Sequence, residues 1–145
     1  MAPRWLDFKE NMSDYARYHA HPGNRVCHAV GIPLIMLAVV RWTQWPGFPL
    51  LPGAAIVLPL YYYWDMGLAL AMTAVILAMA ALASHLSSAA VWGAFILGWV
   101  FQFVGHAAFE KKSPAFTRNL IHLLVGPLWI LRETTGIGRK IESRF

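Results

Sequence analysis

Charged residues are scarce in this chain. They make up 13% of its 145 residues, whereas hydrophobic residues make up 58%. Soluble domains carry about 25% charged residues, so this chain has too few charges to coat a water-facing globule. The high apolar content also excludes an intrinsically disordered chain. Cys27 is the one cysteine, which excludes a disulfide-stapled scaffold. The composition predicts one integral membrane domain over residues 1–145.

The distribution of the charges supports this interpretation. From Trp42 to Phe109 the only acidic or basic residue, apart from histidines, is Asp65. A helix rises 1.5 Å per residue and must cross about 30 Å of hydrocarbon, so a span needs about 20 residues. Turn residues divide the apolar part of the chain into four predicted transmembrane helices, over 26–42, 50–64, 66–84 and 87–107. We therefore expect an all-α membrane bundle.

The two ends of the chain are polar and basic. The first 25 residues predict an amphipathic helix, and residues 119–131 predict a short interfacial or re-entrant helix broken by Gly126-Pro127. If that helix does not cross, eleven of the twelve Lys and Arg residues lie on one side, with Arg41 alone on the other. The positive-inside rule then predicts that both termini are cytoplasmic. From the composition we expect a bacterial inner membrane rather than the endoplasmic reticulum. These basic residues suit anionic membrane lipids, and we expect no nucleic-acid partner.

This topology brings most of the histidines to one face. Of the six histidines, five are expected at the cytoplasmic side, and only His85, in a serine-rich turn, at the far side. The five are His19, His21, His28, His106 and His122. Ionisable residues near hydrocarbon are costly and usually functional, and neutral imidazole is the commonest metal ligand. The alternative for each is an ordinary interfacial polar side chain.

Local spacing sharpens the metal hypothesis. His106 and Glu110 are four residues apart, with Gln102 one turn earlier, and Tyr15 and His19 are also four apart on the expected amphipathic helix. Two or three histidines with a carboxylate and open positions suit non-haem Fe(II) and oxygen chemistry. Glu110 precedes two lysines, so a surface ion pair is the simpler alternative.

The residues also bear on other kinds of iron protein. The chain has no HxxHH-type box, which excludes the di-iron centre of membrane desaturases. Haem held between His28 and His106 remains an alternative. A non-enzymatic protein that binds lipid or shapes the bilayer is a further one.

Two segments resemble a known family. YHAHPGNRVCHAVGIP at 18–33 and GWVFQFVGHAAFEKKSPAFTRNLIHLLVGPLWILRE at 98–133 are similar to signatures of the small membrane 2-hydroxy fatty acid dioxygenases. The resemblance implies an Fe(II)-dependent α-oxidation with molecular oxygen as co-substrate, which yields a fatty acid one carbon shorter. It also implies that His19, His28 and His106 are the metal residues.

The substrate that this resemblance implies suggests roles for nearby residues. The carboxylate and hydroxyl of a 2-hydroxy acid can chelate one metal ion, while the acyl chain arrives laterally from the bilayer. Arg25 could bind the carboxylate bidentately or contact a lipid head group, and Asn24 could touch substrate or cap the first span. Glu110 could be catalytic as a base, complete the iron shell or orient a histidine. The sequence leaves open acyl chain length, stereochemistry, native metal and whether the protein is an oligomer.

Overall fold

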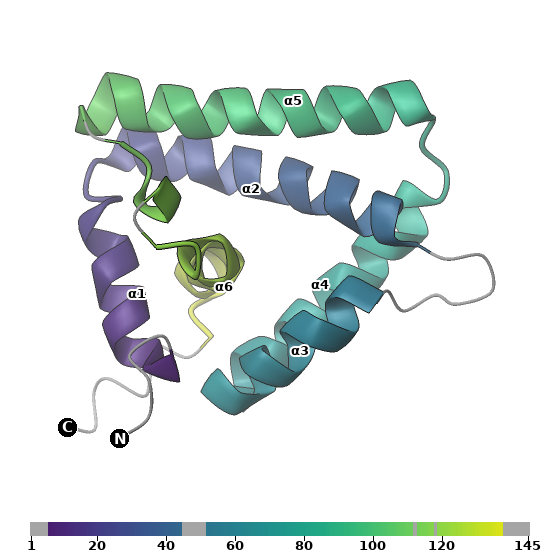
Figure 1. Cartoon of the computed structure of the whole chain (residues 1–145), viewed down its shortest axis with the longest axis horizontal. Helices are drawn as coiled ribbons and strands as arrows, with labels where there is room; N and C mark the ends of the chain where they lie inside the picture. Colours follow the sequence, from purple (N-terminus) through teal and green to yellow (C-terminus); the bar gives the residue numbers. More distant parts are fainter. Residues whose placement is uncertain (1–5, 45–51, 112, 118, 138–145) are drawn as a thin grey trace.

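The chain folds into helices. The computed structural model describes residues 6–44, 52–111, 113–117 and 119–137, and this part contains helices and no strand (Figure 1). The all-α prediction is therefore confirmed. The α-helices are α1 (Phe8–Arg17), α2 (Pro22–Thr43), α3 (Pro52–Trp64), α4 (Met66–Ala83), α5 (Ser88–Val104) and α6 (His122–Thr135). A π-helical turn, η2 (Gly105–Glu110), continues α5, and a short 3₁₀ turn, η3 (Ala115–Thr117), precedes α6.

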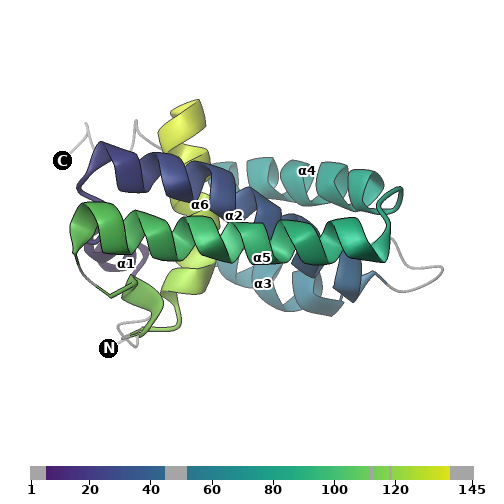
Figure 2. The same cartoon turned by 90° about the horizontal axis from the view of Figure 1, so that it is seen from above.

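Two helix pairs form the body of the molecule. Helices α2 and α5 lie antiparallel along their length, and the α3–α4 hairpin crosses below their far half (Figures 1 and 2). Helix α6 runs across the direction of α2 and α5, and α1 closes the same end (Figures 1 and 2). A core of buried side chains joins α2, α3, α4 and α6; it includes Val40, Tyr61, Leu68, Met72 and Leu128.

Within the described part of the chain, three helices are long and apolar enough to cross a membrane. They are Pro22–Thr43, Met66–Ala83 and the continuous stretch Ser88–Glu110. The predicted span over 50–64 is not confirmed as one, because α3 has 13 residues and rises only about 20 Å. Large hydrophobic side chains are exposed along α4 and α5, as expected of lipid-facing helices; examples are Leu70, Leu77, Ile96, Leu97 and Val100.

Two predicted helix limits were wrong. Helix α2 begins at Pro22, four residues before the predicted start, because Pro22 is pre-set for the first helical position and the His21 side chain caps the Gly23 N–H. Asn24 therefore lies inside the first turn and is not the cap. Helix α6 runs unbroken through Gly126-Pro127 to Thr135, since a proline with helical φ removes one hydrogen bond without forcing a break when packing holds the turn.

Glycines set the close approach of α2 and α5. A Cβ on Gly98 would lie 2.8 Å from the Gly31 carbonyl oxygen and 2.7 Å from Ile35 Cγ1. A Cβ on Gly105 would lie 2.9 Å from Cys27 Cβ. Small residues let helix backbones approach closely. This contact fixes the start of α2 against the end of α5.

Candidate metal centre

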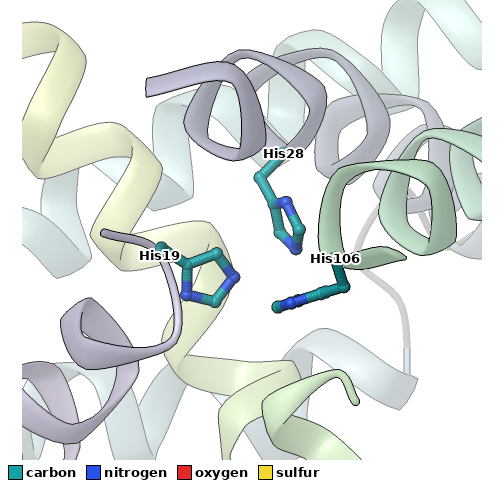
Figure 3. A group of neighbouring side chains, drawn as sticks. All are labelled: His19, His28 and His106. Carbon is teal, nitrogen blue, oxygen red and sulfur yellow. The ribbon is translucent and has the colours of Figure 1, made fainter. Parts of the chain in front are cut away.

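Three buried imidazoles converge at one end of the α2–α5 pair. His19 lies in the turn between α1 and α2, His28 in α2 and His106 in η2, and all three point toward a common centre (Figure 3). Their potential ligand atoms all lie within 4.8 Å of one another. The ring centroids are 4.3 Å apart for His19 and His28, 4.8 Å for His28 and His106, and 5.0 Å for His19 and His106.

Backbone carbonyls orient two of these rings. Nδ1 of His19 lies 2.6 Å from the Tyr15 carbonyl oxygen, and Nδ1 of His28 lies 3.0 Å from that of Asn24. A carbonyl only accepts, so each Nδ1 donates its hydrogen and each Nε2 keeps its lone pair. Metal-binding histidines are commonly held in this way.

The surroundings of His19 keep its ring neutral. The side chain is 1% exposed and stacks on Tyr15 at 3.9 Å between centroids. Burial, together with the nearby His28, lowers the pKa of His19 from 6.5 to about 3. Neutral imidazole is the form that binds metal ions, so His19 is ready to act as a ligand at physiological pH.

A cavity of about 80 Å³ adjoins the three histidines. Imidazole and amide groups of the lining come from His19, His28, Gln102, His106 and His122, and Tyr15 of α1 and residues of α2, α5, η3 and α6 form the rest. Four of these five polar residues carry a buried nitrogen without a hydrogen-bond partner: His19 Nε2, Gln102 Nε2, His106 Nδ1 and His122 Nδ1. Such atoms cost about 1–3 kcal/mol each and are rare in folded proteins. The cavity is thus suited to a bound group that supplies their partners.

The three histidines fit a metal ion. Three atoms 4.8 Å apart have a common centre about 2.8 Å from each, and bonds from imidazole to a metal such as zinc are about 2.0–2.1 Å. Movements of less than about 1 Å would therefore suffice. A porphyrin does not fit, since a cavity of about 150 Å³ holds only benzene and this one is smaller. The haem alternative is disfavoured on size.

His122 lines the cavity, and the sequence predicted no role for it. It is 3% exposed, and its Nε2 lies 3.2 Å from Oδ2 of Asp14, a partly exposed residue of α1. Its ring also meets the edge of Tyr15. Sequence reasoning placed His122 on the correct face, but nothing in its spacing connected it with Asp14. That contact depends on how α6 packs against α1.

Glu110 lies beside the three-histidine group and is not a member of it. Its Oε1 accepts hydrogen bonds from the His21 N–H at 2.8 Å and from Asn24 Nδ2 at 3.3 Å. Asn24 also donates to the Tyr18 carbonyl oxygen at 3.1 Å. Glu110 thereby joins the end of η2 to the start of α2, close to His28. A catalytic role for Glu110 stays a prediction.

Arg25 braces the loop that carries His19. Its Nε donates to the His19 carbonyl oxygen at 2.8 Å, and its guanidinium lies over the Trp129 ring at 5.7 Å. Neither Arg25 nor Asn24 is among the residues that line the cavity. Their predicted contacts with substrate stay a prediction.

The other two histidines lie outside the cavity. His21 is exposed, caps α2 and stacks on Phe109. His85 is exposed in the turn between α4 and α5, at the opposite end of the α2–α5 pair. Four of the five histidines expected on one face therefore line the same cavity.

Apolar helices around a buried, metal-competent histidine cluster define a class: helical proteins suited to the membrane, with a candidate metal centre at one end of the bundle. Within that class the chain belongs to the Mpo1-like family, since the family model described as "2-hydroxy-palmitic acid dioxygenase Mpo1-like" matches residues 5–137. The chain is also similar to the 2-hydroxy-palmitic acid dioxygenase MPO1 of Saccharomyces cerevisiae. The two are 32% identical over 139 residues, which cover 88% of this chain and 79% of the yeast protein. No solved structure matches the chain. The resemblance seen in the sequence is confirmed.

Proposed function

We propose that this protein is an Fe(II)-dependent dioxygenase that shortens 2-hydroxy fatty acids by one carbon. The observation that carries the proposal is the gathering of unpartnered buried nitrogens around one cavity, three of them on histidines and one on Gln102. The yeast relative supports the substrate class, because its name states that it is a dioxygenase of 2-hydroxy-palmitic acid.

The reaction balances without a second reductant. A 2-hydroxy acid and O₂ together contain the atoms of the shortened acid, CO₂ and water. The electrons that reduce O₂ come from the two substrate carbons, whose bond breaks. A reaction that needs no second organic reductant agrees with the size of the cavity, which is too small for both the substrate head and a separate organic co-substrate.

The three histidines would hold the metal. His19, His28 and His106 present neutral nitrogens from three segments, and the carbonyls of Tyr15 and Asn24 fix two of the rings. Three imidazoles leave coordination positions open, as non-haem Fe(II) oxygen chemistry requires. Bound iron would supply the redox chemistry that zinc, which is redox-inactive, cannot.

Two further cavity residues would bind the polar head of the substrate. The Gln102 amide and the His122 ring both line the cavity and hold nitrogens without partners. The carboxylate and hydroxyl of a 2-hydroxy acid offer oxygens for these positions. Asp14 holds the His122 ring in place. Glu110 would act as a positioning residue, because its carboxylate fixes the start of α2 near His28.

The setting of the site suits a lipid substrate. Three apolar helices favour a membrane location, and the site lies at the end of the bundle where α1 and α6 pack (Figure 1). We assign this end to the cytoplasmic side because the basic residues gather in the terminal segments.

The test combines metal content with product identity. Protein purified without oxygen should contain about one iron per chain, as expected for a single ligand set. With 2-hydroxyhexadecanoate and O₂ it should release CO₂ and the acid one carbon shorter, measured by mass spectrometry. Protein that binds no iron and leaves the substrate unchanged would refute the proposal and favour a non-enzymatic lipid-binding role.

A further inference from the structure

The cavity is much smaller than the substrate. Its volume is about 80 Å³, while a cavity of about 150 Å³ is what benzene, with six carbons, occupies. A 2-hydroxy acid with sixteen carbons has roughly three times as many heavy atoms as benzene. Only the head of such an acid fits in the cavity, so most of the acyl chain must lie outside.

Two sides of the cavity are closed by packed side chains. Met36 is packed against the buried core that α2, α3, α4 and α6 share. Tyr15 belongs to a second buried cluster with Met12, Val125 and Trp129. An acyl chain cannot leave through either side without opening a packed core.

The third side is an incomplete wall of partly exposed apolar residues. Trp99 of α5, Phe116 of η3 and Leu123 of α6 line the cavity there, and Leu123 is 45% exposed. The Trp99 ring lies 5.3 Å from Phe116 and 5.7 Å from Phe103, which is also exposed. An apolar surface thus runs without interruption from the cavity to the outside of α5.

The architecture explains why this wall is thin. Helices α5 and α6 each pack against α2, but α6 crosses α2 and α5 instead of lying along them (Figure 2). Between α5 and α6 lies η3, one short 3₁₀ turn (Figure 1). Such a turn covers little surface, and Leu120, at the start of α6, is 72% exposed beside it.

We propose that only the 2-hydroxy carboxylate head enters the cavity and that the acyl chain leaves it laterally between α5 and α6. We name the residues it crosses, Trp99, Phe116 and Leu123, the acyl portal. This inference rests on the proposed function, whose substrate supplies the long chain. The portal selects for an apolar tail and does not measure its full length, because the chain beyond Phe103 and Leu120 lies among membrane lipids.

Photocrosslinking tests the path of the chain without turnover. Two 2-hydroxyhexadecanoate probes, one with a diazirine near the head and one with it near the chain end, are bound under anaerobic conditions in nanodiscs. We expect the head-proximal probe to label cavity residues, and the terminal probe to label α5 around Phe103 and the segment around Leu120. Terminal-probe labelling of α3 and α4, or equal labelling of all exposed helices, would overturn the portal.

Narrowing the portal tests its use in catalysis. Leu123→Trp adds bulk at the rim, and Leu82→Trp places the same side chain at an exposed position of α4. We expect Leu123→Trp to lower kcat/KM for the sixteen-carbon acid about tenfold relative to 2-hydroxyhexanoate, the effect of losing roughly two methylene burials. The matched variant should leave this ratio as in the wild type.

The outcomes separate the two proposals. A wild-type protein that converts no 2-hydroxy acid refutes the proposed function, whatever the labelling pattern. A wild type that converts both acids, with the same chain-length ratio in Leu123→Trp, refutes the acyl portal alone.

Discussion

The two ends of the α2–α5 pair contrast sharply. At one end His28 and His106 meet, and both are buried. At the other end Trp42 of α2 packs against Trp92 of α5 with the ring centroids 4.6 Å apart, and both side chains are about half exposed. The same two helices therefore carry a closed polar centre at one end and an open aromatic contact at the other.

Covering elements account for the difference. Helices α1 and α6 and the turn η2 pack over the histidine end, whereas a tight turn alone joins α4 to α5 at the far end (Figure 1). His85 in that turn is exposed. A histidine becomes a candidate ligand here because three segments bury it beside other imidazoles, and not because of its residue type or its place at a helix end.

The largest effect should follow from removing a histidine at the closed end. His19→Ala, His28→Ala and His106→Ala should each lose bound iron and lower turnover at least about 100-fold, since even indirect supports of a metal site are worth about 10–100-fold. His85→Ala is the control at the open end and should keep both. The iron content is measured by elemental analysis, and the turnover is measured by mass spectrometry of the product. A variant of the three that keeps iron and turnover removes its residue from the ligand set.

A smaller effect should follow from two glycines on α5. Gly98→Ala places a Cβ 2.8 Å from the Gly31 carbonyl oxygen, whereas a Cβ at Gly93 meets nothing within 4 Å. We expect Gly98→Ala to destabilise the folded protein by about 1–3 kcal/mol through overpacking. Gly93→Ala should be neutral or stabilising, because alanine is the better helix former.

The midpoint of thermal unfolding in detergent and the iron content are measured for both variants, Gly98→Ala and Gly93→Ala. Gly98→Ala should also bind iron more weakly, because it separates His28 from His106. Equal midpoints in the two variants would show that the close approach of α2 and α5 contributes nothing to the site.

The smallest effect concerns pH. The pKa of His19 falls from 6.5 to about 3 on burial, so between these values the unfolded chain binds more protons than the folded one. His19 should therefore make stability decrease as pH falls below about 6.5, and this one group contributes at most about 1.4 kcal/mol per pH unit. The unfolding midpoint of iron-free protein, followed from pH 7 to pH 5, measures this slope.

Two variants locate the source of the slope. His19→Gln removes the titrating ring and should reduce the dependence of stability on pH, while His85→Gln at the open end should retain the wild-type slope. An unchanged slope in His19→Gln would assign the acid sensitivity to other groups.

Sequence reasoning found the features that depend on local composition. Sparse charge predicted apolar helices, and an even number of predicted membrane crossings placed His28 and His106 at the same end of the bundle. The choice of His19, His28 and His106 as candidate metal ligands came from the resemblance to a family. The span predicted over 50–64 is not confirmed as a crossing, because α3 has 13 residues and a full span needs about 20.

Features that depend on packing between distant segments were missed. His122 enters the cavity because α6 crosses the bundle and meets Asp14 of α1, which no local spacing encodes. Gly126-Pro127 predicted a break, but the packed turn tolerates the lost hydrogen bond. Glu110 shares a face with His106 as the spacing indicated, yet its hydrogen bonds go to the start of α2.

His19 lies between the amino-terminal helix α1 and the α2–α5 pair. It lies in the short turn after α1, while the other two imidazoles belong to the α2–α5 pair. A metal ion bound by all three histidines would hold the amphipathic helix α1 against the bundle. Thermodynamic linkage then makes docking of that helix and retention of the ion reinforce each other. Removal of the ion by a chelator would loosen α1 before it disturbed the apolar helices.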